Sequence, residues 1–209
     1  MSLYSDHLLP RLTNILLGTK EFAKVRRDAC EGLHGDVIEL GFGSGLNLPY
    51  LPGSVTGVWA IEPSGTATKL AAERITRSPV PVHIVGQDGA RLALPERHFD
   101  AALSTMTLCT IPDVDAALRE LRRVLKPDAV FQFAEHGRSP VETVAHTQDR
   151  FNPIQKRLAG GCHLNRDIAA LVTDAGFDIE DLRNFQLKGP KAWGYMYVGR
   201  ARPAMPDHR

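Results

Sequence analysis

The sequence predicts an α/β fold: a Rossmann-like three-layer sandwich in which helices cover both faces of a seven-stranded, mostly parallel sheet with a final antiparallel strand. Two observations lead to this prediction. Short, continuously apolar segments alternate with segments whose apolar residues recur at helical spacing, which is the pattern of a parallel sheet buried on both faces. The last two apolar segments have no helical segment between them, so we expect them to form an antiparallel pair.

The expected strands are short apolar runs that end at glycine, proline or polar residues. The run Val37-Ile38-Glu39-Leu40, for example, is followed at once by Gly41. Runs of this length and composition are typical of strands in the interior of a sheet. The expected strands are residues 37–40, 55–61, 82–85, 99–104, 130–134, 179–187 and 195–200.

The expected helices have apolar residues three and four positions apart. The clearest is 113–125, where Ala117, Leu118 and Leu121 share one face and charged residues cover the other. Pro127 is expected to stop this helix, and Gly176 stands where a helix C-cap glycine belongs. The expected helices are residues 3–30, 66–77, 113–125 and 166–175.

Length and composition exclude several classes of function. A chain of 209 residues that is 43% apolar predicts one compact domain. A net charge of +1 argues against non-specific binding to nucleic acid. No apolar stretch approaches the roughly 18–20 residues that cross a bilayer, and the first residues lack the pattern of a secretion signal. Three cysteines far apart indicate reduced thiols, so we expect a cytoplasmic protein without stable membrane insertion.

Three glycines at alternate positions, Gly41, Gly43 and Gly45, follow the first expected strand. Because they lack a Cβ, they allow the backbone to turn tightly and to approach a ligand closely. A helix that begins near Asn47 would point its N–H groups at an anionic group. Leu46 stands where the dinucleotide fingerprint GxGxxG has its third glycine, which argues against a nicotinamide-dependent oxidoreductase.

Polar residues follow the second and third expected strands. Glu62, with Pro63 after it, lies about 20 residues beyond the glycines, where a carboxylate accepts hydrogen bonds from both hydroxyls of a ribose. Asp88 and Gly89 follow the next strand, where a carboxylate and a backbone N–H could bind an exocyclic amine and a ring nitrogen. Each feature alone occurs in ordinary turns. Their order after successive strands indicates a nucleoside-bearing ligand.

These motifs resemble those of the class I S-adenosylmethionine-dependent methyltransferases. The resemblance rests on Glu39-x-Gly41-x-Gly43-x-Gly45, on Glu62 and Asp88, and on residues 94–100 and 117–127, which are similar to the family's region around the fourth strand. Asp128-Ala129 departs from the two glycines that the family usually has, which affects a turn. The resemblance implies S-adenosylmethionine as cofactor and S-adenosylhomocysteine as product.

The resemblance also implies roles for individual residues. Glu39 would lie near the methionine amino group, and Thr105 and Met106, after the fourth strand, near the methionine part. No metal is expected, because no metal-ligand spacing is visible. The cofactor-binding residues that it implies are Glu39, Gly41, Gly43, Gly45, Asn47, Glu62, Pro63, Asp88, Gly89, Thr105 and Met106.

Residues 133–139 and 160–167 are similar to a subgroup that includes alkyl-thiol S-methyltransferases. This similarity implies a small-molecule acceptor, a thiol or sulfide, that is methylated by in-line displacement. A quinone-type ring, another small aromatic or a lipid head group is the alternative acceptor. A non-catalytic module that binds a nucleoside cofactor is the alternative from another class of function.

His136, after the fifth strand, and His163, after two glycines, are the candidate catalytic bases. A histidine pKa of about 6.5 suits proton acceptance at neutral pH. The alternative for His136 is a hydrogen bond to the backbone that only shapes the pocket. Cys162 is expected to be a small buried residue rather than a nucleophile.

The N-terminal helix has two interpretations. Leu8, Leu12, Leu16 and Phe22 pack on the sheet, or the helix forms a lid over the acceptor pocket with Tyr4 and His7 facing the substrate. The basic run Lys20, Lys24, Arg26 and Arg27 is expected to be a solvated face. No feature predicts an oligomeric state. We expect a single domain over 1–209, with 1–34 as the helical lid, 35–136 as the cofactor-binding core, and 137–209 as the acceptor-side insert and final strands.

Overall fold

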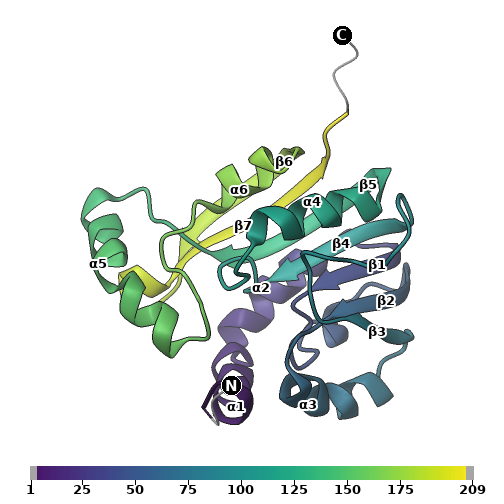
Figure 1. The fold of residues 1–209 in the computed structure, drawn as a ribbon, viewed down its shortest axis with the longest axis horizontal. Helices are drawn as coiled ribbons and strands as arrows, with labels where there is room; N and C mark the ends of the chain where they lie inside the picture. Colours follow the sequence, from purple (N-terminus) through teal and green to yellow (C-terminus); the bar gives the residue numbers. More distant parts are fainter. Residues whose placement is uncertain (1–3, 206–209) are drawn as a thin grey trace.

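The computed structural model describes residues 4–205, which form a seven-stranded sheet covered by helices on both faces (Figure 1). The strand order is β3-β2-β1-β4-β5-β7-β6, and β7 is antiparallel to both of its neighbours. This order confirms the predicted fold class. The strands are β1 (Gly35–Leu40), β2 (Val55–Ile61), β3 (Val82–Gly86), β4 (Phe99–Thr105), β5 (Leu125–His136), β6 (Phe177–Gln186) and β7 (Tyr195–Pro203).

Two apolar cores lie on opposite faces of the sheet. One contains buried residues of α4 (Val114–Val124) and α6 (Ile168–Asp174), and the other contains buried residues of α2 (Lys20–Cys30) and α3 (Gly65–Thr76). The sequence predicted the apolar face of α4, since Ala117, Leu118 and Leu121 are fully buried. The remaining helical elements are η1 (Tyr4–Leu8), α1 (Leu9–Leu17), η2 (Leu48–Tyr50), α5 (Glu142–Leu158) and η3 (Lys191–Trp193).

Several helix predictions were wrong at particular residues. The segment 3–30 is not one helix, because α1 ends at Leu17 and the chain turns at Gly18 and Thr19 before α2 begins. The α-helix expected near Asn47 is absent, and only the three-residue η2, with Pro49 inside it, follows the glycines. The helix 113–125 is confirmed as α4, although it ends at Val124 and Pro127 lies inside β5. Helix α5 was not predicted.

The N-terminal segment forms a strap, residues 4–17, between α3 and α5 (Figure 1). The hydroxyl of Tyr4 donates a hydrogen bond of 2.5 Å to the carbonyl of Leu158, at the end of α5. Leu8, Leu12 and Leu16 are 56%, 43% and 56% exposed, so the interpretation that they pack on the sheet was wrong. None of the helices between residues 4 and 205 is long and apolar enough to cross a bilayer.

The buried face of α4 allows a direct test of the packing. Replacing Leu118 by Ala leaves a cavity in the core, so we expect the free energy of unfolding to fall by about 2–5 kcal/mol. The matched control is Arg119→Ala on the exposed face of the same helix, which should change it by no more than about 0.5 kcal/mol. Urea denaturation followed by circular dichroism measures both. Equal effects of the two substitutions would contradict the packing described.

Candidate active site

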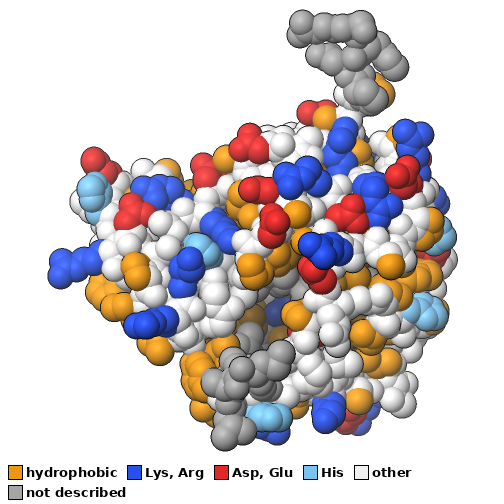
Figure 2. Space-filling view, in the orientation of Figure 1, with side chains coloured by type: hydrophobic (Ala, Val, Ile, Leu, Met, Phe, Trp, Pro, Cys, Tyr) orange, Lys and Arg blue, Asp and Glu red, His pale blue; other side chains and the backbone are white. Residues whose placement is uncertain are grey.

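The candidate site lies at the carboxyl ends of the central parallel strands. Strands β1 and β4 are neighbours in the sheet although they are not consecutive in the chain, so the topology reverses between them. Such a switch point leaves a crevice at the strand ends in which ligands bind. Figure 2 shows a hollow in this face of the molecule, next to the N-terminal strap.

The glycine loop after β1 adopts a backbone that side chains disfavour. The φ angles of Gly41, Gly43 and Gly45 are +68°, +58° and +73°. A Cβ on Gly41 would lie 2.0 Å from the hydroxyl oxygen of Thr107, so this glycine is packed against the loop after β4. A Cβ on Gly43 would meet only a backbone oxygen, at 3.8 Å. The loop is therefore closed at Gly41 and open at Gly43, which leaves room for a ligand beside its backbone.

Glu62 joins the end of β2 to the glycine loop. One carboxylate oxygen accepts a hydrogen bond of 2.7 Å from the backbone N–H of Gly43, and the other accepts one of 2.7 Å from Ser64. Burial raises the pKa of Glu62, and the hydrogen bonds from Ser64 and Gly43 oppose that rise. A carboxylate has about four acceptor sites, so further donors such as ribose hydroxyls fit here. Pro63 lies exposed beside it.

Asn47 is the centre of a buried polar network. Its amide nitrogen donates to Glu39 at 2.7 Å and to the hydroxyl of Thr105 at 2.9 Å. Its amide oxygen accepts a hydrogen bond of 2.8 Å from the guanidinium of Arg26, which also donates to Thr105 at 2.9 Å. All four side chains are buried. The network connects α2, β1, the glycine loop and β4.

Arg26 is a site residue that the sequence analysis missed, and its assignment to a solvated face was wrong. It is 6% exposed. A signal was present, because Val25, Arg26, Ala29 and Cys30 follow helical spacing and form the buried face of α2. The neighbouring Lys20, Lys24 and Arg27 are exposed, as a solvated face requires.

Two atoms of the network have no hydrogen-bond partner among the described residues. They are the second carboxylate oxygen, Oε2, of Glu39 and the Nε of Arg26. Burial raises the pKa of Glu39 from its ordinary value of 4.5 to about 8, although the hydrogen bond from Asn47 and the charge of Arg26 oppose the rise. An unpartnered buried carboxylate oxygen favours a cationic ligand. The ammonium group of S-adenosylmethionine is such a cation, so the residues present fit that cofactor.

Asp88 and Gly89 lie at the edge of the same site. Asp88 is exposed, and its carboxylate accepts a hydrogen bond of 2.9 Å from the N–H of Ala90, which makes a turn. A Cβ on Gly89 would lie 3.2 Å from the side chain of Leu40, the residue before the glycine loop. The structure thus brings this turn next to the glycine loop and leaves part of the Asp88 carboxylate free to accept further donors.

The exit of β4 is held in an uncommon conformation. Met106 has a φ of +55°, which is rare for a residue with a side chain and is typical of functional sites. Its N–H donates to the carbonyl of Ala134 at 2.8 Å. The next N–H, of Thr107, donates to Glu135 at 2.8 Å, and Ser104 donates to the other oxygen of that carboxylate. Burial raises the pKa of Glu135 to about 7.

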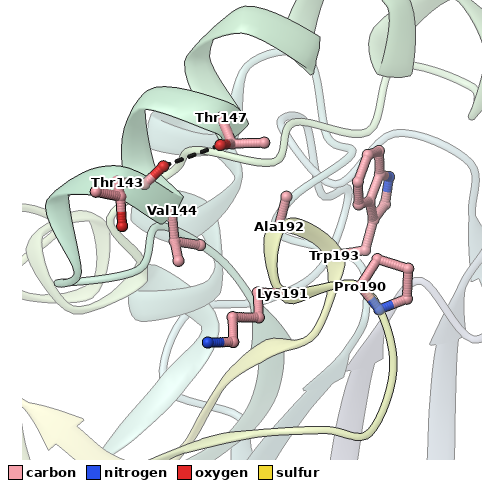
Figure 3. A pocket seen from close by; sticks show the side chains of 7 residues that line it. All are labelled: Thr143, Val144, Thr147, Pro190, Lys191, Ala192 and Trp193. Atoms are coloured by element: carbon pink, nitrogen blue, oxygen red, sulfur yellow. Dashed lines mark hydrogen bonds between the residues drawn. The ribbon is translucent and has the colours of Figure 1, made fainter.

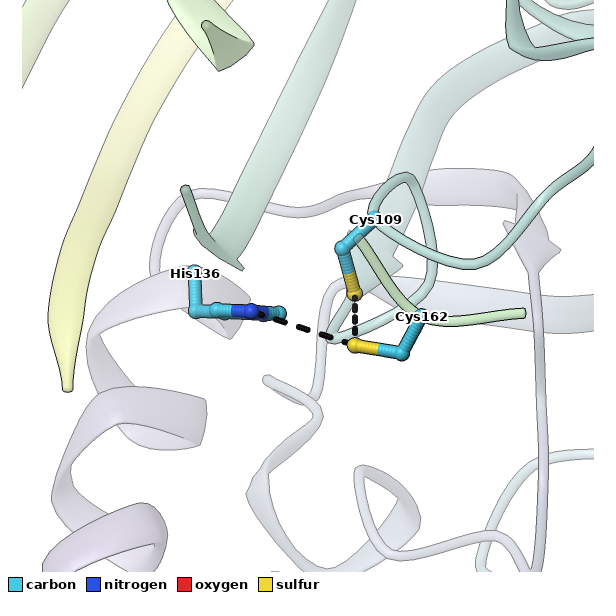
Figure 4. Close-up of side chains that lie close together, drawn as sticks. All are labelled: Cys109, His136 and Cys162. Carbon is cyan, nitrogen blue, oxygen red and sulfur yellow. Dashed lines mark hydrogen bonds between the residues drawn. The ribbon is translucent and has the colours of Figure 1, made fainter. Parts of the chain in front are cut away.

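His136, at the end of β5, forms a cluster with Cys109 and Cys162 (Figure 4). The Sγ of Cys162 lies 3.7 Å from the Sγ of Cys109 and 3.8 Å from the Nε2 of His136. The contact with the Cys109 thiol and the hydrogen bond with His136 lower the pKa of Cys162, and the same pairing of thiols, together with burial, raises the pKa of Cys109. Cys109 was not predicted as a site residue, because its position in the loop after β4 carries no motif.

The side chain of His163 is not part of this cluster, but its backbone is hydrogen-bonded to it. Its N–H donates to the carbonyl of Cys109 at 2.8 Å. Its ring is partly exposed, and burial followed by the charges of Arg166 and Lys156 lowers its pKa. The two candidate bases are therefore different: His136 is buried against the two thiols, and His163 borders solvent.

A second hollow lies away from these residues. A pocket of about 360 Å³ opens between α5 and η3, lined by Thr143, Val144, Thr147 and residues 190–193 (Figure 3). None of the residues that the sequence analysis selected lines it. The hydrogen-bonded groups that could bind a cofactor are at the strand ends instead.

Known proteins with similar sequences are methyltransferases. Residues 38–133 match the model of a family described as "Methyltransferase domain". Human thiol S-methyltransferase TMT1B is 31% identical over 137 residues, which are 63% of this chain and 55% of that protein. Human thiol S-methyltransferase TMT1A is 25% identical over 199 residues, which are 91% of this chain and 76% of that protein. The chain thus spans about half the length of TMT1B.

The fold is also found in a solved structure of this class. A crystal structure of a S-adenosylmethionine-dependent methyltransferase from Methanosarcina mazei superposes with a TM-score of 0.65 and 23% identity. The superposition covers 81% of this chain and 92% of that one. At this identity the likeness concerns the fold alone.

The buried carboxylate of Glu39 gives a prediction about stability. Its pKa of about 8 in the folded protein exceeds its ordinary value of 4.5. The folded state therefore binds this proton more tightly, and the resulting stability is complete below pH about 4.5 and is lost as the pH rises through about 8. Glu39→Gln removes this dependence. As the pH rises across this range, we expect the unfolding temperature of the ligand-free variant to increase relative to that of the wild type. The difference should grow by about 2–4 °C for each kcal/mol of stability that the wild type loses.

Scanning fluorimetry at a series of pH values measures that difference. The comparison between variant and wild type cancels the contribution of Glu135, which titrates in the same range in both proteins. A difference that does not change with pH would contradict the burial argument for Glu39.

The domain match supports the family assignment made from the glycine loop and from the acidic residues after β1 and β2. The sheet order and its antiparallel β7 agree with the fold of the superposed methyltransferase. Residues 38–133 thus match the methyltransferase domain, and the sequence similarities together with the fold support a class I S-adenosylmethionine-dependent methyltransferase.

Proposed function

We propose that this protein transfers a methyl group from S-adenosylmethionine to the sulfur of a small-molecule thiol or sulfide. The cofactor supplies a methyl group on a sulfonium, which is activated for in-line displacement. The observation that carries the proposal is the buried, unpartnered Oε2 of Glu39 beside the open glycine loop. The acceptor is inferred from the thiol S-methyltransferases that the chain resembles.

On the cofactor side, the protein binds and orients. Glu39 offers an unpartnered carboxyl oxygen and Arg26 an unpartnered N–H, as the ammonium and carboxylate groups of an amino acid require. Glu62 accepts from the ribose hydroxyls while it holds the backbone of Gly43. Gly41, Gly45 and Asn47 shape the loop, and Pro63 borders the ribose. Asp88 and Gly89 bind the adenine, and Thr105 and Met106 border the methionine part.

On the acceptor side, the protein positions a soft nucleophile and excludes water. His136 and the two thiols present sulfur and nitrogen atoms at the ends of β4 and β5. His136 or His163 accepts the proton of an acceptor that must lose one. A thiol needs little such help, because a pKa of about 8.5 leaves part of it ionised near neutral pH.

The domain organisation follows from this division. In our proposal, residues 35–136 form the cofactor-binding core, whose strand ends also contribute Cys109 and His136 to the acceptor side, and residues 137–209 form the acceptor-side insert and the final strands. Residues 1–34 act as a lid, supported by the contacts of the strap with α3 and with the end of α5. Tyr4 and His7 are exposed here, and the structure joins them to Leu158 and Thr66. We further propose that the protein works in the cytoplasm.

Cofactor binding depends on Glu62 in this proposal. Hydrogen bonds to a charged partner are worth about 1.5–3 kcal/mol, so we expect Glu62→Ala to weaken S-adenosylmethionine binding by roughly 10- to 150-fold. Isothermal calorimetry with S-adenosylmethionine and S-adenosylhomocysteine measures this. The matched control is Glu73→Gln on α3, whose carboxylate is exposed and pairs with Arg77. Binding that survives Glu62→Ala unchanged, or a wild type that binds neither compound, is incompatible with the proposal.

The acceptor is tested with a panel of labelled reactions. We expect wild-type protein to methylate a small alkyl thiol or hydrogen sulfide, and His136→Ala to lower turnover at least about 10-fold without changing cofactor affinity. The panel also contains a reduced quinone, a phenol and an amine. Methylation of the reduced quinone alone would favour the alternative acceptor. No methylated product from any compound, with cofactor still bound, would favour a binding module without turnover.

A further inference from the structure

Three side chains that bind soft metals converge on the acceptor side of the site. Cys109 comes from the loop after β4, His136 from the end of β5 and Cys162 from the loop after α5 (Figure 4). Their ligating atoms all lie within 4.8 Å of one another. Within residues 4–205, no other group of three His, Cys, Asp or Glu side chains meets this condition. The cofactor side of the site contributes none of these atoms.

Two of the three distances between the ligating atoms are close to those of a zinc site. Zn–S bonds of about 2.3 Å and Zn–N bonds of about 2.0 Å in tetrahedral geometry place two sulfur atoms about 3.7–3.8 Å apart and sulfur about 3.5 Å from nitrogen. The structure has 3.7 Å between the two Sγ atoms and 3.8 Å between Cys162 Sγ and His136 Nε2. Two thiolates and an imidazole suit Zn²⁺ and disfavour Mg²⁺ or Ca²⁺, which prefer oxygen ligands.

The ligands are held in place by the backbone without a metal. The N–H of His163, next to Cys162, donates to the carbonyl of Cys109 at 2.8 Å and so ties the two cysteine loops together. His136 is fixed by the pairing of β5 with β7. Cys109 and His136 are 2% and 4% exposed. The Nδ1 of His136 has no partner among the described residues, so the buried ring is not satisfied by the protein alone.

We propose that Cys109, His136 and Cys162 bind a Zn²⁺ ion whose fourth position takes the sulfur of the methyl acceptor. Three protein ligands and an open fourth position are the arrangement of catalytic rather than structural zinc. The identity of the fourth ligand rests on the proposed thiol methylation. The site also changes the role of His136, which acts as a metal ligand through Nε2 instead of as a base.

Methyl transfer at this site needs no oxidant or reductant. The acceptor thiol loses its proton to solvent when its sulfur binds the metal, because a coordinated thiol is deprotonated. A lone pair of that sulfur forms the bond to the methyl carbon, while the bond between this carbon and the sulfonium breaks. The electron pair of the broken bond stays on the sulfur of S-adenosylhomocysteine. The product is a neutral thioether, which is a weaker ligand than a thiolate and leaves.

Thr107 connects the cluster to the glycine loop. The hydroxyl of Thr107 lies 3.4 Å from the carbonyl oxygen of Gly41, and Cys109 follows two positions later. Glu135, which accepts from the N–H of Thr107, directly precedes His136. The metal and the methyl donor would therefore border the same short loop after β4.

The test is the zinc content of the whole chain, purified with a reductant, incubated with zinc sulfate and dialysed. We expect about one zinc per chain by plasma mass spectrometry and less than about one tenth in Cys109→Ser and in Cys162→Ser. The matched control is Cys30→Ser, which removes a buried thiol of α2 outside the cluster. Circular dichroism and calorimetry with S-adenosylmethionine establish that each variant is folded and binds cofactor.

The absorption spectrum of the cobalt-substituted wild type tests the site without any substitution in the protein. We expect the absorption bands of tetrahedral Co²⁺ and a thiolate-to-cobalt charge-transfer band, and we expect a small alkyl thiol to shift them. Octahedral bands without charge transfer, a metal-free wild type, or zinc lost equally from Cys30→Ser would each overturn the site. A metal-free protein that methylates thiols overturns this inference and supports the proposed function. The third outcome is a protein that binds zinc but methylates no thiol, and whose cobalt form shows no change in its absorption bands when a thiol is added. This outcome overturns the assignment of the fourth ligand and the proposed acceptor.

Discussion

The buried hydrogen bonds of the Asn47 side chain hold together the part of the site that is proposed to bind the cofactor. Its amide donates to Glu39 and to Thr105 and accepts from Arg26, so one residue joins two strands, a helix and the glycine loop. Each partner is buried, and a missing bond would leave a polar group without water or protein. The network therefore fixes where the carboxylate of Glu39 stands relative to the loop, and with it the position of any ligand that binds there.

The same network leaves opposite charges incompletely satisfied. The Oε2 of Glu39 and the Nε of Arg26 lack partners within residues 4–205. A partly satisfied buried network is costly in the ligand-free protein, and a ligand that completes it recovers that cost on binding. The unpartnered atoms therefore lower the stability of the free protein and raise its affinity for a ligand that completes the network. The positive φ of Met106, at the adjacent strand end, is a second strained feature that the surrounding hydrogen bonds hold in place.

The sequence predicted what depends on local pattern and missed what depends on long-range packing. Apolar runs located all seven strands, and the spacing of glycines and acidic residues located the glycine loop and Glu62. Arg26 was missed because it lies in a basic run, although its helical spacing with Val25, Ala29 and Cys30 places it on the buried face of α2. Cys109 and Cys162 are 53 residues apart, and only the fold brings them together. Helix α5 was missed because Pro153 lies inside it and few of its residues are buried.

The two halves of the site are built in different ways. The cofactor side is anchored to strand ends, where the sheet pairing fixes Glu39 in β1 and Thr105 in β4. The acceptor side depends on loops: Cys162 follows a turn in which Gly160 and Gly161 have φ of +60° and +92°. A Cβ on Gly160 would lie 2.8 Å from Leu9, so the strap packs directly against this turn. Changes in α5 or the turn would therefore move Cys162 without moving Glu39. Acceptor choice can then diverge while cofactor binding is retained.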